Sequence, residues 1–418
     1  MRRRLRSRPH PIRPRMGRAG RVAAGSEHPR PSRAPLLLIL LLVLLPAACE
    51  PGEAGRDGVV EHPIPDSLAT HPDQAVVVPA DPDAPAPEAA RAFGSLLLGH
   101  TVLQTIGVED GPDEYVLGDI ADARLLPDGT VGVVDRQAAE VRFYDPAGSH
   151  LSSLGGPGEG PGEFSHPSLL LVPSPARLWV MDPPRGIHRF SPGAEGWEFQ
   201  DRLTLEGRPG HGCTSAGGVV VHMGLPSPDA EPGPVLHRLD GDGQSVDAFA
   251  LPYRYDYWLV RERMNQGVIA CPEGDTTILG LTAMNRVEAY SANEGRLLWH
   301  ATFEGMAVPP VEERPRPEGE PGVGLQRPDG PVVHTLTGVT AVADAPVVVV
   351  QFAWRSVEDL EAGVARPSFE TFVLDVHAGE GTYLGDTLPR ILWAGGDRAL
   401  FASADPYPRI KLVALGTD

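Results

Sequence analysis

Two stretches of the chain decide its fold. Residues 123–155 read ARLLPDGTVGVVDRQAAEVRFYDPAGSHLSSLG, and residues 168–205 read SLLLVPSPARLWVMDPPRGIHRFSPGAEGWEFQDRLTL. Asp135 in the first stretch matches Asp182 in the second, and the triplet Val141-Arg142-Phe143 matches His188-Arg189-Phe190 at the same offset of 47 residues. A period of this length is typical of four-stranded propeller blades and is too long for leucine-rich repeats.

The first stretch divides into four short apolar runs separated by turn residues. Asp128-Gly129 and the segment Asp145–Gly148 have the composition of hairpin turns, because glycine accepts a positive φ and proline presets the first turn position. The predicted strands are Ala123–Leu126, Val131–Val134, Glu140–Tyr144 and His150–Leu154.

Weaker copies of this pattern continue to the end of the chain. The class is therefore all-β, and we predict a single six-bladed β-propeller of four-stranded antiparallel blades over residues 98–418, with seven blades as the alternative. The last copy lacks a fourth strand, which Thr101–Gly107 could supply by closing the ring. The strands expected in the later copies are Gly218–Met223, Leu236–Asp240, Val268–Ala270, Thr277–Leu281, Val287–Tyr290, Val339–Val342, Val347–Phe352, Thr371–Val376, Ile391–Ala394, Ala399–Ser403 and Ile410–Ala414.

Between the two stretches lies GGPGEGPGEF (155–164), followed by Ser165-His166-Pro167, an apolar strand and Asp182. This order resembles the NHL-repeat pattern, and the chain is similar to six-bladed propeller lipoproteins of bacteria. The resemblance is specific over residues 115–205. We expect its motif residues to be structural: Phe164 packs between blades, while Asp135 and Asp182 accept backbone N–H bonds in the following turn.

The first 48 residues have the features of an export signal. They hold eleven arginines and one acid, then the apolar run Leu36–Leu45, then Ala47-Ala48-Cys49. The site resembles a bacterial lipobox, which implies lipidation of Cys49, although Pro46 stands where that pattern has an aliphatic residue. An ordinary cleavage after Ala48 is the alternative. Residues 49–97, rich in Pro, Ala and acids, are predicted to be a solvated tether. Glu50 favours the outer membrane over the inner.

The charge of the chain restricts its partners. The formal net charge is −19, from 36 basic and 55 acidic residues, and eleven of the basic residues but only one of the acids lie in the predicted signal. The remainder is still more acidic, so counterion release cannot drive nucleic-acid binding. We expect no nucleic-acid partner, a membrane contact through the lipid, and a monomer. Cys213 and Cys271 could form a disulfide in an oxidising compartment or remain free thiols, since spacing alone does not decide.

Propeller topology predicts which side chains share a face. The linker before each inner strand should lie on the same face as the turn between strands two and three. A ligand or partner is therefore expected on the face that holds His166 and the YRYDYW segment. The predicted residues of this face are Arg136, Glu140, Asp182, Arg185, His188, Tyr253, Tyr255, Tyr257 and Trp258.

Two functions fit this sequence. The first is a membrane-anchored, extracytoplasmic binding or scaffold module for an unidentified protein, peptide or small molecule. The alternative is a metal-dependent lyase or lactone hydrolase, with a divalent ion held by His166, His211 and His334, which each precede an inner strand. The sequence contains no Gly-x-Ser-x-Gly or His-Glu-x-x-His motif, which favours the binding module.

Overall fold

The computed structural model describes residues 75–416 except 184, 195, 217, 226–232, 256, 309–310, 316–320, 326–330 and 363–366. The predicted signal, Cys49 and residues 49–74 of the predicted tether lie outside the described residues. No helix in the described part of the chain is long and apolar enough to cross a membrane.

The two stretches that carry the repeat form two four-stranded antiparallel sheets, as predicted. Each sheet keeps its strands in chain order, because each hairpin turn brings the next strand beside the previous one. The strands of the first sheet are β3 (Ile120–Leu125), β4 (Val131–Asp135), β5 (Glu140–Tyr144) and β6 (His150–Gly155). Those of the second are β7 (Leu169–Ser174), β8 (Arg177–Asp182), β9 (Gly186–Gly193) and β10 (Gly196–Leu203).

The same order continues along the chain. A third sheet contains β11 (Pro209–Ser215), β12 (Gly218–Met223), β13 (Leu236–Leu239) and β14 (Ser245–Phe249). Helix α2 (Trp258–Met264) then leads to β15 (Gly267–Ala270), β16 (Thr276–Leu281), β17 (Arg286–Ser291) and β18 (Leu297–Phe303).

The C-terminal part forms an eight-stranded sheet, in which two four-stranded units meet through a short parallel pairing of β21 with β25. Its strands are β21 (Val332–Ala343), β22 (Val347–Ser356), β23 (Ser368–Asp375), β24 (Gly381–Tyr383), β25 (Arg390–Gly395), β26 (Arg398–Ser403), β27 (Arg409–Ala414) and β2 (Thr101–Ile106). The remaining elements are the hairpin β19 (Val311–Pro315) and β20 (Pro321–Leu325), the 3-10 turn η2 (Asp113–Tyr115) and helix α3 (Val357–Glu361).

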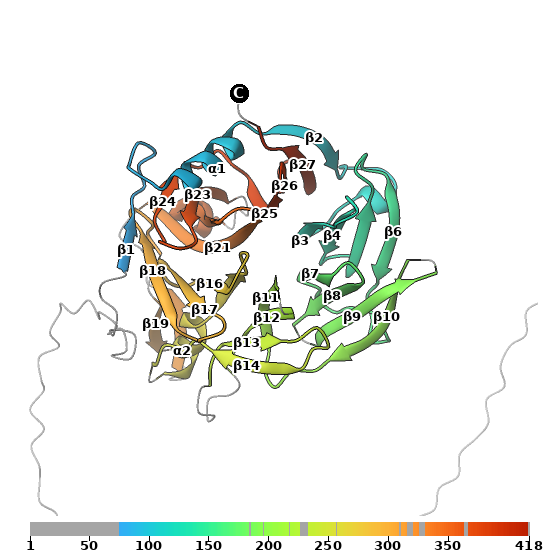
Figure 1. Ribbon diagram of the computed structural model, residues 1–418, viewed down its shortest axis with the longest axis horizontal. Helices are drawn as coiled ribbons and strands as arrows, with labels where there is room; N and C mark the ends of the chain where they lie inside the picture. The colour runs from blue at the N-terminus through green and yellow to red at the C-terminus, as the bar shows by residue number, and fades with distance from the viewer. Residues whose placement is uncertain are drawn as a thin grey trace, which may run out of the picture. The chain divides into compact units, whose positions relative to one another are not determined.

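The sheets are arranged around a common centre, with β3, β7 and β11 innermost and β6, β10 and β14 at the rim (Figure 1). The N-terminal strand β2 pairs antiparallel with the C-terminal strand β27. The predicted closure by Thr101–Gly107 is therefore confirmed. It joins the two ends of the domain and removes an open sheet edge.

Residues 75–97 correct the predicted tether, because they are folded against the sheets. Strand β1 (Ala75–Val78) pairs parallel with β18, and Val78 is 1% exposed. Helix α1 (Glu88–Leu98) buries Ala90, Phe93 and Leu97 among side chains of the C-terminal sheet. These three residues recur at a spacing of three and four, so they lie on one helical face. The Pro- and Ala-rich composition hid this periodicity.

Apolar side chains between neighbouring sheets form the core. Phe164, which is 0% exposed, contacts Phe190 and lies in a cluster with Val141 and Leu178, as its place in the linker predicts. A Cβ atom on Gly155 would lie 2.3 Å from the Phe164 ring, and Gly155 has a φ of +95°. Only glycine fits there without a shift of the linker.

Asp135 and Asp182 tie the linkers to the sheets. Asp135 accepts N–H bonds from Gly118 and Asp119 in the linker, and from Gln137 and Ala138 in the following turn. The predicted role in the following turn is thus confirmed for Asp135. The Asp182 carboxylate instead accepts from Ser165 (2.7 Å) and His166 (3.0 Å), the equivalent linker positions one repeat later. Each aspartate therefore fixes the linker before an inner strand to the end of the second strand.

Candidate functional site

A cavity at the centre of the ring opens on the side where linkers lead into the inner strands, which we call the linker face. It has a volume of about 690 Å³, and we call it the linker-face cavity. It is lined by the N-terminal parts of β11, β15, β21 and β25, by the end of α2, and by the strand two–three turn residues Pro183 and Thr282. Linkers and strand two–three turns thus share a face, as predicted.

Four arginines from separate elements line this cavity. Arg208 precedes β11, Arg263 lies in α2, Arg355 is near the end of β22, and Arg390 begins β25. Glu262 is the one acidic residue among the lining residues that the structure describes. The cavity wall is therefore basic in a chain with 55 acidic and 36 basic residues.

Two of these arginines are held in place by the surrounding chain. Arg390 donates to the backbone oxygens of Ile120 (3.3 Å) and Ala121 (3.1 Å), and burial lowers the pKa of its guanidinium while nearby Asp122 raises it. Arg263 donates from Nη1 to Oε1 of Gln266 at 2.5 Å. These contacts position the two guanidiniums at the cavity before any ligand arrives.

Arg208 and Arg355 have no carboxylate partner among the described residues. Arg208 is exposed and Arg355 is half-buried. A guanidinium cannot lose its proton near neutral pH, so both groups carry a full positive charge beside the cavity.

His222 adds a neutral group to the same wall. It is 2% exposed, its Nε2 lies 2.9 Å from the backbone oxygen of Asn265, and its Nδ1 has no hydrogen-bond partner within the described structure. Burial lowers the pKa of His222 to about 4, although the hydrogen bond to Asn265 opposes this. His222 is therefore uncharged at pH 7 and adds no charge to that of the arginines.

A second cavity of about 510 Å³ adjoins the first, and both are lined by Pro367, Phe369 and Arg390. Its other walls come from the linker at 118–120 and from residues 386–389 and 402–405. Its charged side chains are mixed, with Asp119, Asp386 and Asp405 against Lys411 and Arg390. Arg390 thus stands between a basic cavity and a mainly acidic one.

The opposite side of the ring carries the strand one–two hairpins, and we call it the hairpin face. Its central cavity, the hairpin-face cavity, has a volume of about 270 Å³ and is lined by the C-terminal parts of β3, β7, β11, β15, β21 and β25. Its charged side chains are Arg124 and Glu273. This end of the channel is therefore smaller than the other and carries few charges.

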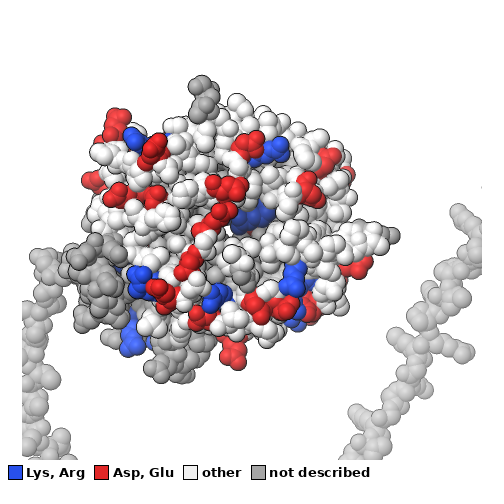
Figure 2. Space-filling model, in the orientation of Figure 1, with Lys and Arg blue, Asp and Glu red and all other residues white. Residues whose placement is uncertain are grey.

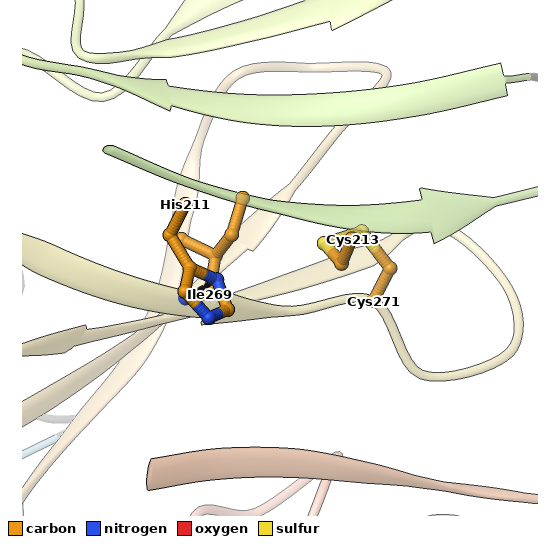
Figure 3. Close-up of a disulfide and its surroundings, with 4 residues drawn as sticks. All are labelled: His211, Cys213, Ile269 and Cys271. Carbon is orange, nitrogen blue, oxygen red and sulfur yellow. Dashed lines mark hydrogen bonds between the residues drawn. A yellow bond between two sulfur atoms is a disulfide. The ribbon is translucent and has the colours of Figure 1, made fainter. Parts of the chain in front are cut away.

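Cys213 and Cys271 form a disulfide at the hairpin-face cavity, which answers the question that their spacing left open. Their Cα atoms are 5.5 Å apart, so the bond joins β11 to the turn after β15 (Figure 3). His211 lies on the same pair of strands and accepts the N–H of Ile269 at 3.1 Å. The bond covalently links two sheets that are neighbours in the ring.

The histidines predicted to bind a metal are not brought together. Among the described residues no group of three His, Cys, Asp or Glu side chains is placed to hold a metal ion. His166 is exposed in its linker, the Nδ1 of His211 is occupied by Ile269, and the Nδ1 of His334 accepts the N–H of Ala307 at 3.0 Å. The three rings therefore do not converge on one point, because those of His211 and His334 bond to backbone N–H groups and that of His166 is exposed in its linker.

His188 and Asp182 are also buried, which corrects their assignment to an open binding face. His188 is 1% exposed, lies against the rings of Phe164 and Phe199, and has its Nε2 4.0 Å from Asp182. Burial lowers its pKa, and neither ring nitrogen has a hydrogen-bond partner in the described structure. The residue sits between sheets because β9 directs it toward the linker that holds Phe164.

The other predicted face residues of the first two sheets are near the surface and paired with acids or bases. Arg136 bonds to Asp119 at 3.2 Å, Arg185 lies 3.2 Å from Glu159, and Glu140 accepts from Arg142 at 3.0 Å. None of these three residues lines the linker-face cavity. Arg136 is exposed, whereas Arg185 and Glu140 are half-buried, and Glu140 lines a separate cavity with Asp135 and Arg142.

The YRYDYW segment leads into α2 and is partly structural. Tyr253 is 5% exposed and donates to Glu288, which Arg286 and Tyr290 also contact, so Tyr253 is part of a buried network. Burial raises the pKa of Tyr255 to about 12, and Tyr257 is half-buried. Trp258 is 37% exposed at the start of α2. The segment therefore anchors the helix that brings Arg263 to the cavity.

Sequence reasoning missed Arg208, Arg263, Arg355 and Arg390. Two of them could have been predicted from their positions in the sequence. Arg208 stands directly before an inner strand and Arg390 at the start of one, which places both at the linker face. Arg355 could not be predicted in this way, because the length of β22 decides where it lies.

On the face drawn in Figure 2, acidic side chains form a row across the domain, with a basic patch in the hollow beside it.

No protein-family model and no curated protein matches the chain. Solved structures do match. A Bacteroides fragilis protein provisionally named as exported is similar over 82% of this chain and 99% of its own, with 9% identity and a TM-score of 0.51. The domain is a β-propeller. Two further structures are less similar. The β-propeller domain of Cps50 (Swd1) from Myceliophteria thermophila has 10% identity and a TM-score of 0.41, and the match covers 76% of this chain and 100% of that domain. The WD40 repeats of RRP9 have 10% identity and a TM-score of 0.45, and the match covers 76% of this chain and 97% of theirs. At these identities the likeness concerns the fold alone.

Proposed function

We propose that the chain is an exported, lipid-anchored propeller of six blades, related to NHL-repeat lipoproteins, that binds a small-molecule ligand in its linker-face cavity. The six inner strands around the hairpin-face cavity and the order of the four-stranded units support this blade number. The glycine-rich linker with Phe164 and the paired aspartates Asp135 and Asp182 supports the NHL likeness.

The compartment is supported by two separate features. A disulfide between Cys213 and Cys271 is consistent with an oxidising, extracytoplasmic location. The basic segment, the short apolar run and Cys49 follow the pattern of a lipoprotein signal, and Glu50 favours the outer membrane. Replacing Cys49 by Ala should move the protein from the detergent phase to the aqueous phase in detergent phase separation. An unchanged distribution would exclude the lipid anchor.

One observation carries the binding role: the linker-face cavity. Its volume of about 690 Å³ is within the roughly 300–1,000 Å³ typical of ligand pockets. It combines apolar side chains such as Leu336 and Phe369 with a few charged groups, which is the usual composition of such sites. The hairpin-face cavity is less than half as large, at about 270 Å³.

A matched pair of substitutions tests the binding role without knowing the ligand. Thr337 of β21 lines the linker-face cavity, and Thr214 of β11 lines the hairpin-face cavity. Protein isolated from its own membrane is examined by native mass spectrometry as wild type, Thr337→Trp and Thr214→Trp. We expect a co-purifying small molecule in the wild type and in Thr214→Trp, and its loss in Thr337→Trp. If Thr337→Trp keeps the small molecule and Thr214→Trp loses it, the ligand binds in the hairpin-face cavity and the proposal is wrong.

A further inference from the structure

The arginines of the linker-face cavity indicate the chemistry of its ligand. Charged lining residues should follow the composition of the chain, in which acids outnumber bases, yet this cavity has four arginines and one glutamate among its described lining residues. The guanidiniums come from four elements that are distant in sequence, so the fold gathers them rather than a local charge run. Positive charges held beside one cavity repel each other, and an anion bound between them offsets this electrostatic repulsion.

Two of the four arginines already donate hydrogen bonds to the surrounding chain, and in the described part of the chain the other two do not. We regard the first two as anchored groups and the other two as the groups that bind the ligand. Arg390 uses two of its nitrogens on the backbone of Ile120 and Ala121, and Arg263 uses one on Gln266. Arg208 and Arg355 make no ion pair with a described carboxylate. Their donors remain available, and the planar fork of a guanidinium matches a carboxylate or phosphate with two parallel hydrogen bonds.

The remaining wall is apolar or neutral. Val268, Leu336, Ala353 and Phe369 contribute carbon surface, and His222 is neutral at pH 7. A bare inorganic ion would leave this surface unused in a cavity of about 690 Å³, whereas an organic anion would cover it.

We propose that the linker-face cavity binds a small organic anion, with its carboxylate or phosphate groups held by Arg208 and Arg355 and its carbon skeleton against Leu336 and Phe369. Arg390 and Arg263 keep their contacts to the neighbouring chain and add positive charge to the cavity wall. The inference rests on the proposed binding role and names the ligand class of that same cavity. Carboxylate and phosphate share the oxyanion chemistry, and the experiment separates the two.

The test is isothermal titration of the purified chain with citrate, glucose 6-phosphate and glucose, at constant ionic strength set with sodium chloride. Constant ionic strength removes the general screening effect of the added salt. We expect at least one of the two anions to bind with a Kd in the millimolar range or below, while glucose does not bind. The stronger of the two anions identifies the carboxylate or the phosphate as the preferred group.

Variants then locate the site. Arg355→Gln and, separately, Arg208→Gln should weaken the anion roughly tenfold or more, the usual effect of losing a hydrogen bond between charged groups. Arg296→Gln is the matched control, because Arg296 is exposed and paired with Glu294 on the β17–β18 turn. It should leave the affinity unchanged. Thermal unfolding of all three variants checks that the fold is kept, and Arg208 is exposed enough to be replaced without loss of packing.

Three results would overturn the inference: neither anion binds at about 10 mM, which would exclude even millimolar affinity; glucose binds as well as glucose 6-phosphate; or both cavity variants bind as the wild type does. If Thr337→Trp loses a co-purifying ligand but neither anion binds, the proposed binding role survives and only the ligand class is wrong. If Thr337→Trp keeps that ligand, the binding role itself fails.

Discussion

The cavities at the two faces of the ring share the inner strands β11, β15, β21 and β25 but differ in size, charge and covalent bonding. At the linker face the cavity has a volume of about 690 Å³ and four arginines, whereas at the hairpin face it has about 270 Å³, Arg124 and Glu273. The hairpin end is also joined across two sheets by Cys213–Cys271. The difference follows from the connections: tight hairpins satisfy their own backbone, while longer linkers and helices place side chains over the channel.

This contrast predicts that stability and binding can be changed separately. Substitutions at the hairpin end should lower the free energy of unfolding and leave anion binding intact. Substitutions of the cavity arginines should do the reverse.

Removing the disulfide should have the largest effect on stability. The bond closes a loop with a sequence separation of 58 residues, so replacing both Cys213 and Cys271 by Ser should lower the free energy of unfolding by about 3–4 kcal/mol. Urea unfolding of the oxidised wild type and the double variant measures this. Titration with the anion at a temperature where both remain folded should give the same affinity. A large loss of affinity would show that the two ends are not independent.

Asp182 and Asp128 provide a matched pair of aspartates at opposite faces. Asp182 is 0% exposed and accepts two linker N–H groups, so Asp182→Ala should lower the free energy of unfolding by about 2–3 kcal/mol. Asp128 is exposed and accepts one N–H from Thr130 at 2.9 Å, so Asp128→Ala should lower it by at most about 1–2 kcal/mol. Equal effects in urea unfolding would argue against a special role of the linker aspartates.

His222 predicts a smaller, pH-dependent effect at the linker face. Its folded-state pKa is about 4, below the ordinary value of 6.5, so the unfolded chain binds the proton at a higher pH than the folded chain. The contribution of neutral His222 to the free energy of unfolding is fully present above pH 6.5 and is lost as the pH falls toward 4. From pH 7 to pH 5, His222→Gln should therefore lose about 2 kcal/mol less stability than the wild type. Urea unfolding of the wild type and His222→Gln at pH 7 and at pH 5 measures this, and an equal loss of stability in the two proteins would contradict it.

Much of the fold could be predicted because its determinants are local. Asp-Gly and Asp-Pro-x-Gly turns define hairpins within a few residues, and the 47-residue offset places Asp135 and Asp182 at equivalent positions. The observed strands β3–β6 agree with their predicted bounds to within a few residues. Closure by β2 could also be predicted, since the last unit lacked a strand that only the N-terminal segment could supply.

The site could not be predicted to the same extent, because it depends on which distant side chains meet. Arg208 lies in the linker before β11 and Arg355 lies in β22, and nothing local indicates that one cavity holds both. The partnership of Cys213 with Cys271 likewise depends on the contact of β11 with β15. His188 and the predicted metal ligands failed for the same reason: residue type and position suggested a face, but packing between sheets decided the direction of each ring.

If the ligand binds in the linker-face cavity, it should protect only the linker-face ends of the inner strands. Strands β15 and β21 run from one end to the other, so amide hydrogen exchange along them compares the two ends within one molecule. With the stronger of the two anions present, we predict slower exchange at Gly267–Val268 and Thr335–Thr337, and no change at Ala270–Glu273 or Ala341–Ala343. Slower exchange at the hairpin end, with none at the linker end, would contradict the account.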